Sequence, residues 1–361
     1  MQHALCHYFF AIVFVAVVAA VASTSKASIS ENCNLFVAHN GSDQNGCGTV
    51  ETPCGTLAQA VAAAKEGAVI CVWAFEGAYE LESAIVTNKS LHFQSLNGKA
   101  VVDCRGHGSA FQIRNRGFST FVGFEIMNCR IDGAGAAISF QNVPSIRVED
   151  CRFINNSASG ISSGGGAISV SSGIAYSGVC EMVFLNNTFI NNSASSGGAV
   201  LFIMDANIQM RFEGNTLTGN SGNSGGTLCL QVRGSGFVSA VLRENKFVNN
   251  SAANGGAVYF YPQPAGPGHP SLLLESNEFK GNYATARGGA FYFYDFFYMN
   301  QGFNQGLLSL IGNNFSDNRA LGDGGGISLV PLGLFDGTFI VKNNWMARNS
   351  AAKGGGLALN A

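Results

Sequence analysis

Three carboxylate side chains could carry out acid–base chemistry on a sugar: Glu244, Glu275 and Glu278. Hydrolysis of a glycosidic bond needs two carboxyl groups about 5–10 Å apart, one acting as an acid and the other as a base or nucleophile. If neighbouring segments of the chain stack, these three residues could approach each other on one face. The alternative is that each Glu is a solvated charge on a strand, and the sequence favours this interpretation.

Metal and cofactor chemistry is not indicated by the spacing of possible ligands. The chain has no Cys-x2-Cys pair and no closely spaced histidines after residue 7, and Asp317 and Asp323 stand apart from other acidic residues. The formal net charge of −2 gives no basic surface for nucleic acid. We therefore expect no cofactor, no metal ion and no nucleic-acid partner.

Aromatic residues offer a second kind of chemistry, which is ligand contact. Three insertions are expected to project as loops from one edge of the fold: 261–270, which is Pro-rich and apolar, 292–303, which is rich in Tyr and Phe, and 331–335. Exposed aromatic rings are common contact residues for sugars and proteins. The alternative is that these rings fold back over the chain beneath them. The candidate binding residues are Tyr292, Tyr294, Phe296, Phe297, Tyr298 and Phe303.

The elements that position these residues come from a repeat. A motif with Phe or Leu followed three residues later by Asn recurs about seven times after residue 150. Each copy is followed by Gly-Gly, then by Ala, Thr or Gly, and then by an apolar residue. Phe precedes the first Gly by eight or nine residues in most copies, whereas the period varies from about 28 to 36 residues. A fixed inner frame with insertions at one edge is typical of a solenoid.

The residue types explain how such a solenoid is held together. In a parallel β-helix the same position of each turn stacks about 4.8 Å above the last. Phe at an inward position gives a column of rings, and Asn at a bend can take a left-handed conformation and bond to the Asn of the next turn. The predicted columns are Phe153, Phe189, Phe247, Phe279 and Phe315, and Asn156, Asn192, Asn220, Asn250, Asn282 and Asn318.

The two motifs resemble those of the polymorphic outer-membrane-protein repeat family, within the pectin-lyase-like proteins. The resemblance covers roughly residues 120–361 and implies an all-β, right-handed parallel β-helix associated with surface display and adhesion. The chain departs from that family because it has no C-terminal membrane barrel and stops inside a repeat, at Asn360-Ala361. We expect the C-terminus to be truncated or capped unusually. A run of β-hairpins is the alternative, but hairpins need two-residue turns between alternating strands.

Enzymes of the wider pectin-lyase-like group suggest one further motif. Gly106-His107-Gly108 resembles a short polygalacturonase motif, in which the His works beside clustered aspartates. The chain shows no such cluster, and the tripeptide falls in a turn where small residues are needed. The sequence therefore favours binding over catalysis, with polysaccharide cleavage as the alternative.

Residues 33–119 are predicted to form an N-terminal cap and the first turns. Residues 35–37 read as a strand, and a helix begins after Thr56, with Leu57, Val61 and Ala64 on one face. This helix would cover an open sheet edge. The four cysteines between residues 33 and 71 would cross-link the cap through disulfide bonds. Cys104, Cys129 and Cys151 precede arginines about one turn apart, so they form a disulfide or a buried thiol stack.

The first residues are typical of an exported protein. Residues 9–21 are apolar and Ala20-Val21-Ala22 is a cleavage site, so we assign residues 1–22 to a signal peptide. An uncleaved anchor is the alternative, because no Lys or Arg precedes the apolar run. Nine cysteines remain after cleavage, which leaves at least one unpaired within the chain. The seven Asn-x-Ser/Thr acceptors indicate a glycoprotein if the source is eukaryotic: Asn40, Asn88, Asn155, Asn186, Asn191, Asn249 and Asn314.

These patterns together predict an extracellular or surface-displayed protein with a structural, adhesive or binding role. Its expected partners are extracellular glycans or cell-surface proteins. The repeats should occupy residues 120–361, with the aromatic edge as the candidate contact surface.

Overall fold

The computed structural model describes residues 33–114, 117–160, 163–172, 178–234, 236–262, 270–296, 306–332 and 337–360. Asn34–Ala361 forms one compact unit. The signal peptide predicted over residues 1–22 lies outside the described residues. Among those residues that are described, no helix has the length and apolar character needed to cross a membrane.

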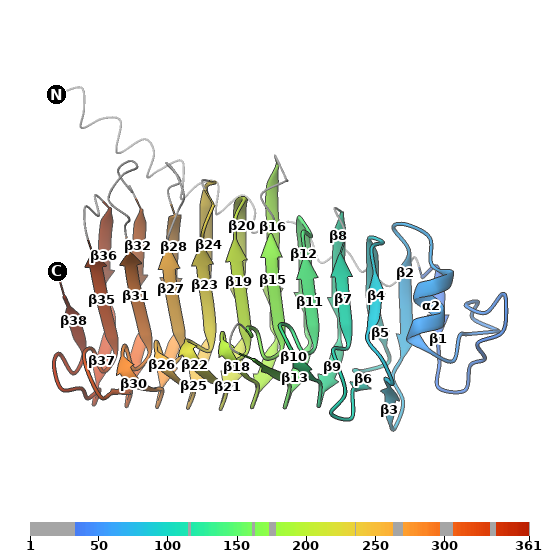
Figure 1. Cartoon of the computed structure of the whole chain (residues 1–361), viewed down its shortest axis with the longest axis horizontal. Coiled ribbons are helices and arrows are strands. Elements are labelled where there is room, and N and C mark those ends of the chain that lie inside the picture. Colours follow the sequence, from blue (N-terminus) through green and yellow to red (C-terminus); the bar gives the residue numbers. More distant parts are fainter. Residues whose placement is uncertain are drawn as a thin grey trace. The chain divides into compact units, whose positions relative to one another are not determined.

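This compact unit is a parallel β-helix. One turn passes through four sheets, as β16 (Val179–Leu185), β17 (Thr188–Ile190), β18 (Ser193–Ser196) and β19 (Val200–Met204) illustrate. The next strand, β20 (Asn207–Glu213), pairs in parallel with β16 of the turn before. Figure 1 shows the turns side by side, in sequence order from blue to red. The predicted all-β parallel helix is confirmed.

Each sheet collects one strand from successive turns of the described chain. The first sheet adds to β16 and β20 the strands β1 (Leu35–Val37), β2 (Val69–Trp73), β5 (Leu91–Leu96), β8 (Phe118–Val122), β12 (Ser145–Glu149), β24 (Val238–Arg243), β28 (Pro270–Glu275), β32 (Leu307–Ile311) and β36 (Thr338–Lys342). The second adds to β17 the strands β3 (Ala78–Glu80), β6 (Ala100–Asp103), β9 (Phe124–Met127), β13 (Arg152–Ile154), β21 (Thr216–Thr218), β25 (Lys246–Val248), β29 (Glu278–Lys280), β33 (Asn314–Ser316) and β37 (Trp345–Ala347).

The other two sheets close the turn. The third adds to β18 the strands β10 (Arg130–Asp132), β14 (Ser157–Ser159), β22 (Ser221–Gly225), β26 (Ser251–Asn254), β30 (Tyr283–Arg287) and β34 (Arg319–Ala320). The fourth adds to β19 the strands β4 (Ile85–Thr87), β7 (Phe111–Arg114), β11 (Ile138–Gln141), β15 (Ile168–Ser172), β23 (Leu228–Val232), β27 (Val258–Pro262), β31 (Phe291–Phe296), β35 (Ile327–Leu332) and β38 (Leu357–Leu359).

Phenylalanine rings from the second sheet form a column in the core. Phe153 stacks on Phe189 with ring centroids 5.0 Å apart, and Phe279 lies between two further rings at 4.9 and 4.6 Å. Leu217 takes the equivalent position in β21, so the column has one aliphatic layer. All of these side chains are fully buried. The ring column therefore joins neighbouring turns through apolar contact.

A ladder of buried asparagines follows the ring column at the next corner. From Asn192 onward, each Oδ1 accepts hydrogen bonds from the backbone N–H and Nδ2 of the Asn one turn earlier, over 2.9–3.1 Å. Each Nδ2 also donates to a backbone carbonyl of the preceding turn, as Asn220 does to Phe189. This ladder contains Asn156, Asn192, Asn220, Asn250, Asn282, Asn318 and Asn349.

The ladder residues do not carry the left-handed conformation that was expected of them. It falls on the residue before each one, including Asn155, Asn191 and Gly219, whose φ angles are 54°, 52° and 64°. The physical reason is that the two neighbouring residues have different roles. The left-handed residue turns the backbone and stays at the surface, which lets the next side chain point inward and bond along the stack.

A second asparagine ladder, not predicted from the sequence, lies at the corner between the first and second sheets. It repeats the same bonding over 2.8–3.1 Å. Its members are Asn187, Asn215, Asn245, Asn277, Asn313 and Asn344. Its signal was the Asn two residues before the Phe or Leu of every motif copy from Phe189 to Phe315.

The Gly-Gly corner leads from the third sheet to the fourth. Gly197 has a φ angle of 58°, in the region that side chains avoid. A Cβ on Gly198 would lie 2.3 Å from the carbonyl oxygen of Ser221 in the next turn. Neither position tolerates a side chain, which explains why two glycines recur together.

The predicted N-terminal cap is confirmed. Helix α2 (Leu57–Ala63) begins after Thr56, whose hydroxyl accepts from the Gln59 backbone N–H at 3.2 Å. Leu57, Ala60 and Val61 are buried against the first turns, and Figure 1 shows α2 at the β1 end of the stack. Cys47 is disulfide-bonded to Cys54, and Cys33 and Cys71 are disulfide-bonded as well.

Two of the three predicted stacking cysteines bond to each other. Cys104 and Cys129 form a disulfide, with Cα atoms 4.7 Å apart. The expectation that Cys151 stacks with them is wrong, because Cys129 is followed one turn later by Asn156, 27 residues on. Cys151 instead lies in the column of the second ladder, where its N–H donates to Asn187. Three thiols are free and buried in the described chain: Cys151, Cys180 and Cys229.

Candidate functional site

Four tyrosines form a compact array on the outward side of the fourth sheet. Strand β27 contributes Tyr259 and Tyr261, and β31 of the next turn contributes Tyr292 and Tyr294. Because alternate residues of a strand share a face, the two strands in register place all four rings together. Neighbouring ring centroids lie 5.3–5.9 Å apart, and the ring planes differ by 17–21°. We call these four residues the tyrosine cluster.

The tyrosine cluster replaces smaller, non-aromatic residues of the same two columns. In the first column, Ser169 and Leu201 precede Cys229, Tyr259 and Tyr292. Tyr292 is 4% exposed, whereas Tyr259, Tyr261 and Tyr294 are half-buried. The rings are therefore fixed by their neighbours while part of three of them stays accessible.

One edge of the cluster is charged. The guanidinium of Arg287, at the end of β30, hydrogen-bonds the hydroxyl of Tyr292. Its Nε lies 3.5 Å from a carboxylate oxygen of Asp323, which also accepts from the Asn360 amide at 3.2 Å. The Arg287 side chain is 44% exposed, and that of Asp323 is 16% exposed. The cluster thus presents phenol groups beside an anchored, partly accessible cation.

Burial sets the ionisation of this surface. Desolvation raises the pKa of Tyr259 and of Tyr292, although the hydrogen bond from Arg287 opposes the rise at Tyr292. Burial also raises the pKa of the Cys229 thiol, beneath the cluster, to about 12. Tyr259, Tyr292 and this thiol are therefore neutral at physiological pH. The rings of the cluster can stack on a ligand, and their hydroxyl groups can exchange hydrogen bonds with it.

The sequence placed part of this surface in a loop, and that placement is wrong for three residues. Tyr292, Tyr294 and Phe296 belong to strand β31, because the Tyr-x-Tyr alternation continues the strand beyond the Gly-Gly corner. Phe297, Tyr298 and Phe303 lie outside the described residues. Tyr259 and Arg287 were not singled out, and Tyr261 was named only as the start of the segment 261–270. The repetition of Tyr-Phe-Tyr at 259–261 and 292–294 was the available signal.

The three candidate catalytic carboxylates occupy different positions of the turn. Glu244 is exposed at the corner after β24, with a φ angle of 55°. Glu275 ends β28, and a carboxylate oxygen accepts from Arg243 Nε at 2.8 Å. Glu278 lies in β29, in register with Lys246 of the turn before. The register thus assigns each Glu to its own column, and Glu275 is already engaged in an ion pair.

The other acidic and histidine residues weighed from the sequence also have structural surroundings. Asp317 accepts two hydrogen bonds from Arg348 at 2.6 and 2.8 Å, which lowers the pKa of Asp317. Gly106-His107-Gly108 is a turn between β6 and β7, as expected. Within the described ranges, no group of three His, Cys, Asp or Glu residues could hold a metal ion.

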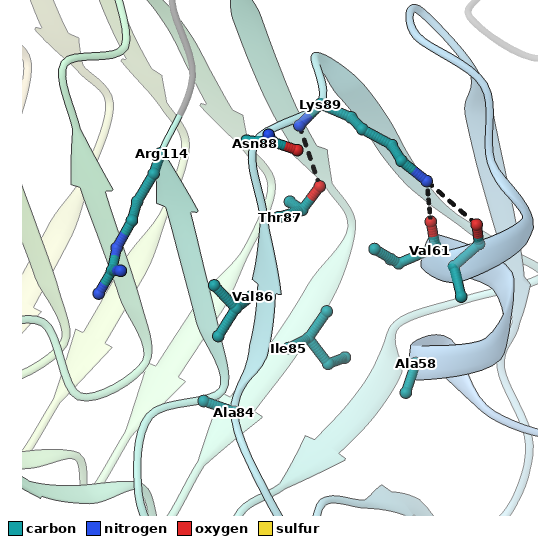
Figure 2. A pocket seen from close by; sticks show the side chains of 10 residues that line it. Ala58, Val61, Ala84, Ile85, Val86, Thr87, Asn88, Lys89 and Arg114 are labelled. Carbon is teal, nitrogen blue, oxygen red and sulfur yellow. Dashed lines mark hydrogen bonds between the residues drawn. The ribbon is translucent and has the colours of Figure 1, made fainter.

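A cavity of about 460 Å³ lies between the cap helix and strand β4. Figure 2 shows Ile85 and Val61 on its apolar walls, with Lys89 extending toward α2 and Arg114 extending away from Lys89. The Lys89 ammonium donates to the carbonyls of Val61, Ala62 and Ala64 at 2.8–3.1 Å. These are the C-terminal carbonyls of the helix, so the Lys89 ammonium holds the cap helix against the segment that follows β4.

One repeat of the chain matches the model of a known protein family. The family model for the Chlamydia polymorphic membrane protein repeat matches residues 150–171, the first copy of the paired motifs. No curated protein matches the chain. A solved structure, of a GH136 lacto-N-biosidase from Eubacterium ramulus in its selenomethionine form, is similar with a TM-score of 0.33 and 10% identity. That alignment covers 88% of this chain and 68% of the other.

Proposed function

We propose that this chain is an extracellular or surface-displayed β-helix that adheres to a cell-surface protein through the tyrosine cluster. The observation that carries the proposal is the array of four near-parallel phenol rings beside Arg287. Tyr and Arg are the side chains that most often dominate binding energy at protein interfaces. Rings held in a sheet lose little conformational freedom on binding, which favours affinity.

Three features support display outside the cell. The repeat that matches residues 150–171 is that of a polymorphic membrane protein family. Disulfides such as Cys104–Cys129 persist in oxidising compartments and are rare in the cytosol. All seven Asn-x-Ser/Thr acceptor asparagines are exposed, whereas the ladder asparagines beside several of them are buried. An exported chain could therefore carry glycans without losing its ladders.

An adhesion assay tests the proposal. Beads coated with the secreted chain are counted on cultured cells, and wild type is compared with a Tyr261→Ser, Tyr294→Ser double variant. These two rings are half-buried on the outward face, so their loss leaves the core columns intact. Ile203→Ser is the matched control, because Ile203 lies in the same outward column two turns before Tyr261.

The expected result is adhesion by wild type and by the control, and at least a tenfold loss in the double variant. Tenfold corresponds to about 1.4 kcal/mol, a modest loss for two interface tyrosines. Brief trypsin treatment of the cells should abolish adhesion, whereas glycosidase treatment should not. Adhesion that survives trypsin but not glycosidase would instead identify a glycan receptor. Equal adhesion by all three proteins would refute a role for the cluster.

A further inference from the structure

We infer that a pocket at the N-terminal end of the β-helix is a second binding site, for a neutral or amino sugar. The pocket has a volume of about 470 Å³, within the size range of small-molecule sites. Its walls include Trp73, Phe75, His39, Asn40 and Glu51. These residues come from the end of β2 and from the loop that follows β1, and none belongs to the tyrosine cluster. The site is therefore independent of the proposed adhesion surface.

The aromatic wall of the pocket is rigid. Trp73 stacks on Phe36 with ring centroids 5.2 Å apart, and Phe75 stacks on His39 at 4.2 Å. Tyr79 meets Phe75 edge to face at 5.1 Å, and its hydroxyl donates to the Trp73 carbonyl at 2.6 Å. Both wall rings are half-buried. They give the apolar face of a sugar ring a surface that does not have to be ordered on binding.

The polar wall selects among sugars. Glu51 supplies a carboxylate that accepts from hydroxyl or amino groups, and the Asn40 amide both donates and accepts. His39 and these two side chains are exposed in the described structure. The described lining contains no Lys or Arg, so a uronate or a phosphate would meet Glu51 without a compensating cation. The ligand is therefore a neutral or cationic polyol with an apolar face, as in a hexose or a hexosamine.

A disulfide, hydrogen bonds and close packing fix the loop that carries the polar wall. The Cys47–Cys54 disulfide crosses it. Asp43 accepts from the backbone N–H groups of Gly55 and Thr56, at 2.8 and 2.9 Å, and from the Thr56 hydroxyl at 2.7 Å. A Cβ on Gly41 would lie 2.4 Å from the Cys54 carbonyl oxygen, so the loop packs closely on the chain it contacts. The pocket is thus formed before any ligand arrives.

Tryptophan fluorescence offers a direct test, because the chain has only two tryptophans, Trp73 and Trp345. Trp345 is 67% exposed in the last turn, so Trp345→Phe leaves Trp73 as a single reporter inside the pocket wall. The full chain is exported to a bacterial periplasm, which forms disulfides and adds no glycan to Asn40. It is titrated with neutral hexoses, N-acetylhexosamines and their oligomers, and with oligouronates as the anionic comparison.

The expected result is a saturable blue shift of Trp73 emission with at least one neutral or amino sugar and none with uronates. Glu51→Gln should weaken that binding about fivefold, because a hydrogen bond to a charged group becomes one to a neutral amide. The matched control is Glu82→Gln, an exposed Glu outside the pocket lining. The Tyr261→Ser, Tyr294→Ser variant should titrate like the parent, which separates this site from the adhesion surface.

Three outcomes would overturn the inference. One is the absence of a saturable change with any neutral or amino sugar at millimolar concentration. Another is equal binding of uronates, which would contradict selection by Glu51. The third is identical affinity in the Glu51→Gln and Glu82→Gln variants, which would place the sugar elsewhere.

Discussion

Replacing one ladder asparagine should destabilise the stack far more than replacing an exposed asparagine of the same turn. Asn220 is fully buried, and its side chain takes part in four hydrogen bonds. Asn220→Ala removes all four. The Asn192 backbone N–H then loses its Asn220 Oδ1 partner, while the Asn192 amide keeps its bond to Phe153 and the Asn250 oxygen keeps the Asn220 N–H.

The expected loss follows from those contacts. One buried N–H without a partner costs about 1–3 kcal/mol, and each of the other three bonds contributes about 1 kcal/mol. The free energy of opening around residues 187–220 should therefore fall by about 4–6 kcal/mol, before any cavity term. Asn223→Ala is the control, since Asn223 is exposed in β22, three residues away. It should change stability by less than about 0.5 kcal/mol.

Native-state hydrogen exchange is the appropriate assay, because a stack of turns can open locally instead of unfolding as a whole. A loss of about 4–6 kcal/mol corresponds to a roughly 1,000-fold or greater increase in the exchange rate of amides flanking the substituted turn. Amides of the cap, for example in α2, should change little. Equal exchange in Asn220→Ala and Asn223→Ala would refute the ladder as a source of stability.

Three further outcomes follow from the core and the buried ionisable groups. Phe279→Ala removes a ring stacked on both sides and should cost about 3–5 kcal/mol in urea unfolding, whereas Phe237→Ala, at a residue 65% exposed, should cost under ~1 kcal/mol. Burial raises the pKa values of the three free thiols, Cys151, Cys180 and Cys229. Maleimide should therefore label these three thiols slowly in the native protein and rapidly in the unfolded protein. Burial also raises phenol pKa values above the ordinary value near 10. The neutral phenols thus stabilise the fold fully below pH 10, and this contribution is lost as pH rises from there through the folded pKa. Absorbance titration should show delayed ionisation in the native state alone for Tyr79 (pKa about 12), Tyr259 and Tyr292; simultaneous ionisation of all tyrosines near pH 10 would contradict their burial.

Much of the fold could be predicted because its stabilising contacts repeat. The spacing of Phe189, Asn192 and Gly197 recurs in later turns, and each recurring residue type has one physical role in a stack. The cap helix was also predictable, since Thr56 and the apolar face of residues 57–64 are local signals. Local signals of this kind do not depend on knowing which turn lies above which.

Columns that depend on an exact register were harder to predict. Cys129 and Cys151 are 22 residues apart, which resembles a turn, yet the turn from Cys129 ends at Asn156. The tyrosine cluster had the same difficulty. Tyr259 and Tyr292 come together only because the variable segment between the turns is excluded from the strand register. Variable insertions hide such columns, since sequence distance no longer equals one turn.

Engineered disulfides across the tyrosine cluster test the central claim, that stacked turns in register bring these residues together. In the Tyr261→Cys, Tyr294→Cys variant the Cα atoms should lie about 4.8 Å apart, within the range that a disulfide requires. Mass spectrometry after mild oxidation should find the 261–294 bond, and none in Tyr261→Cys, Phe293→Cys, because Phe293 is buried in the core. Bonding in the second variant and not the first would show a register shifted by one residue, and the cluster would not exist.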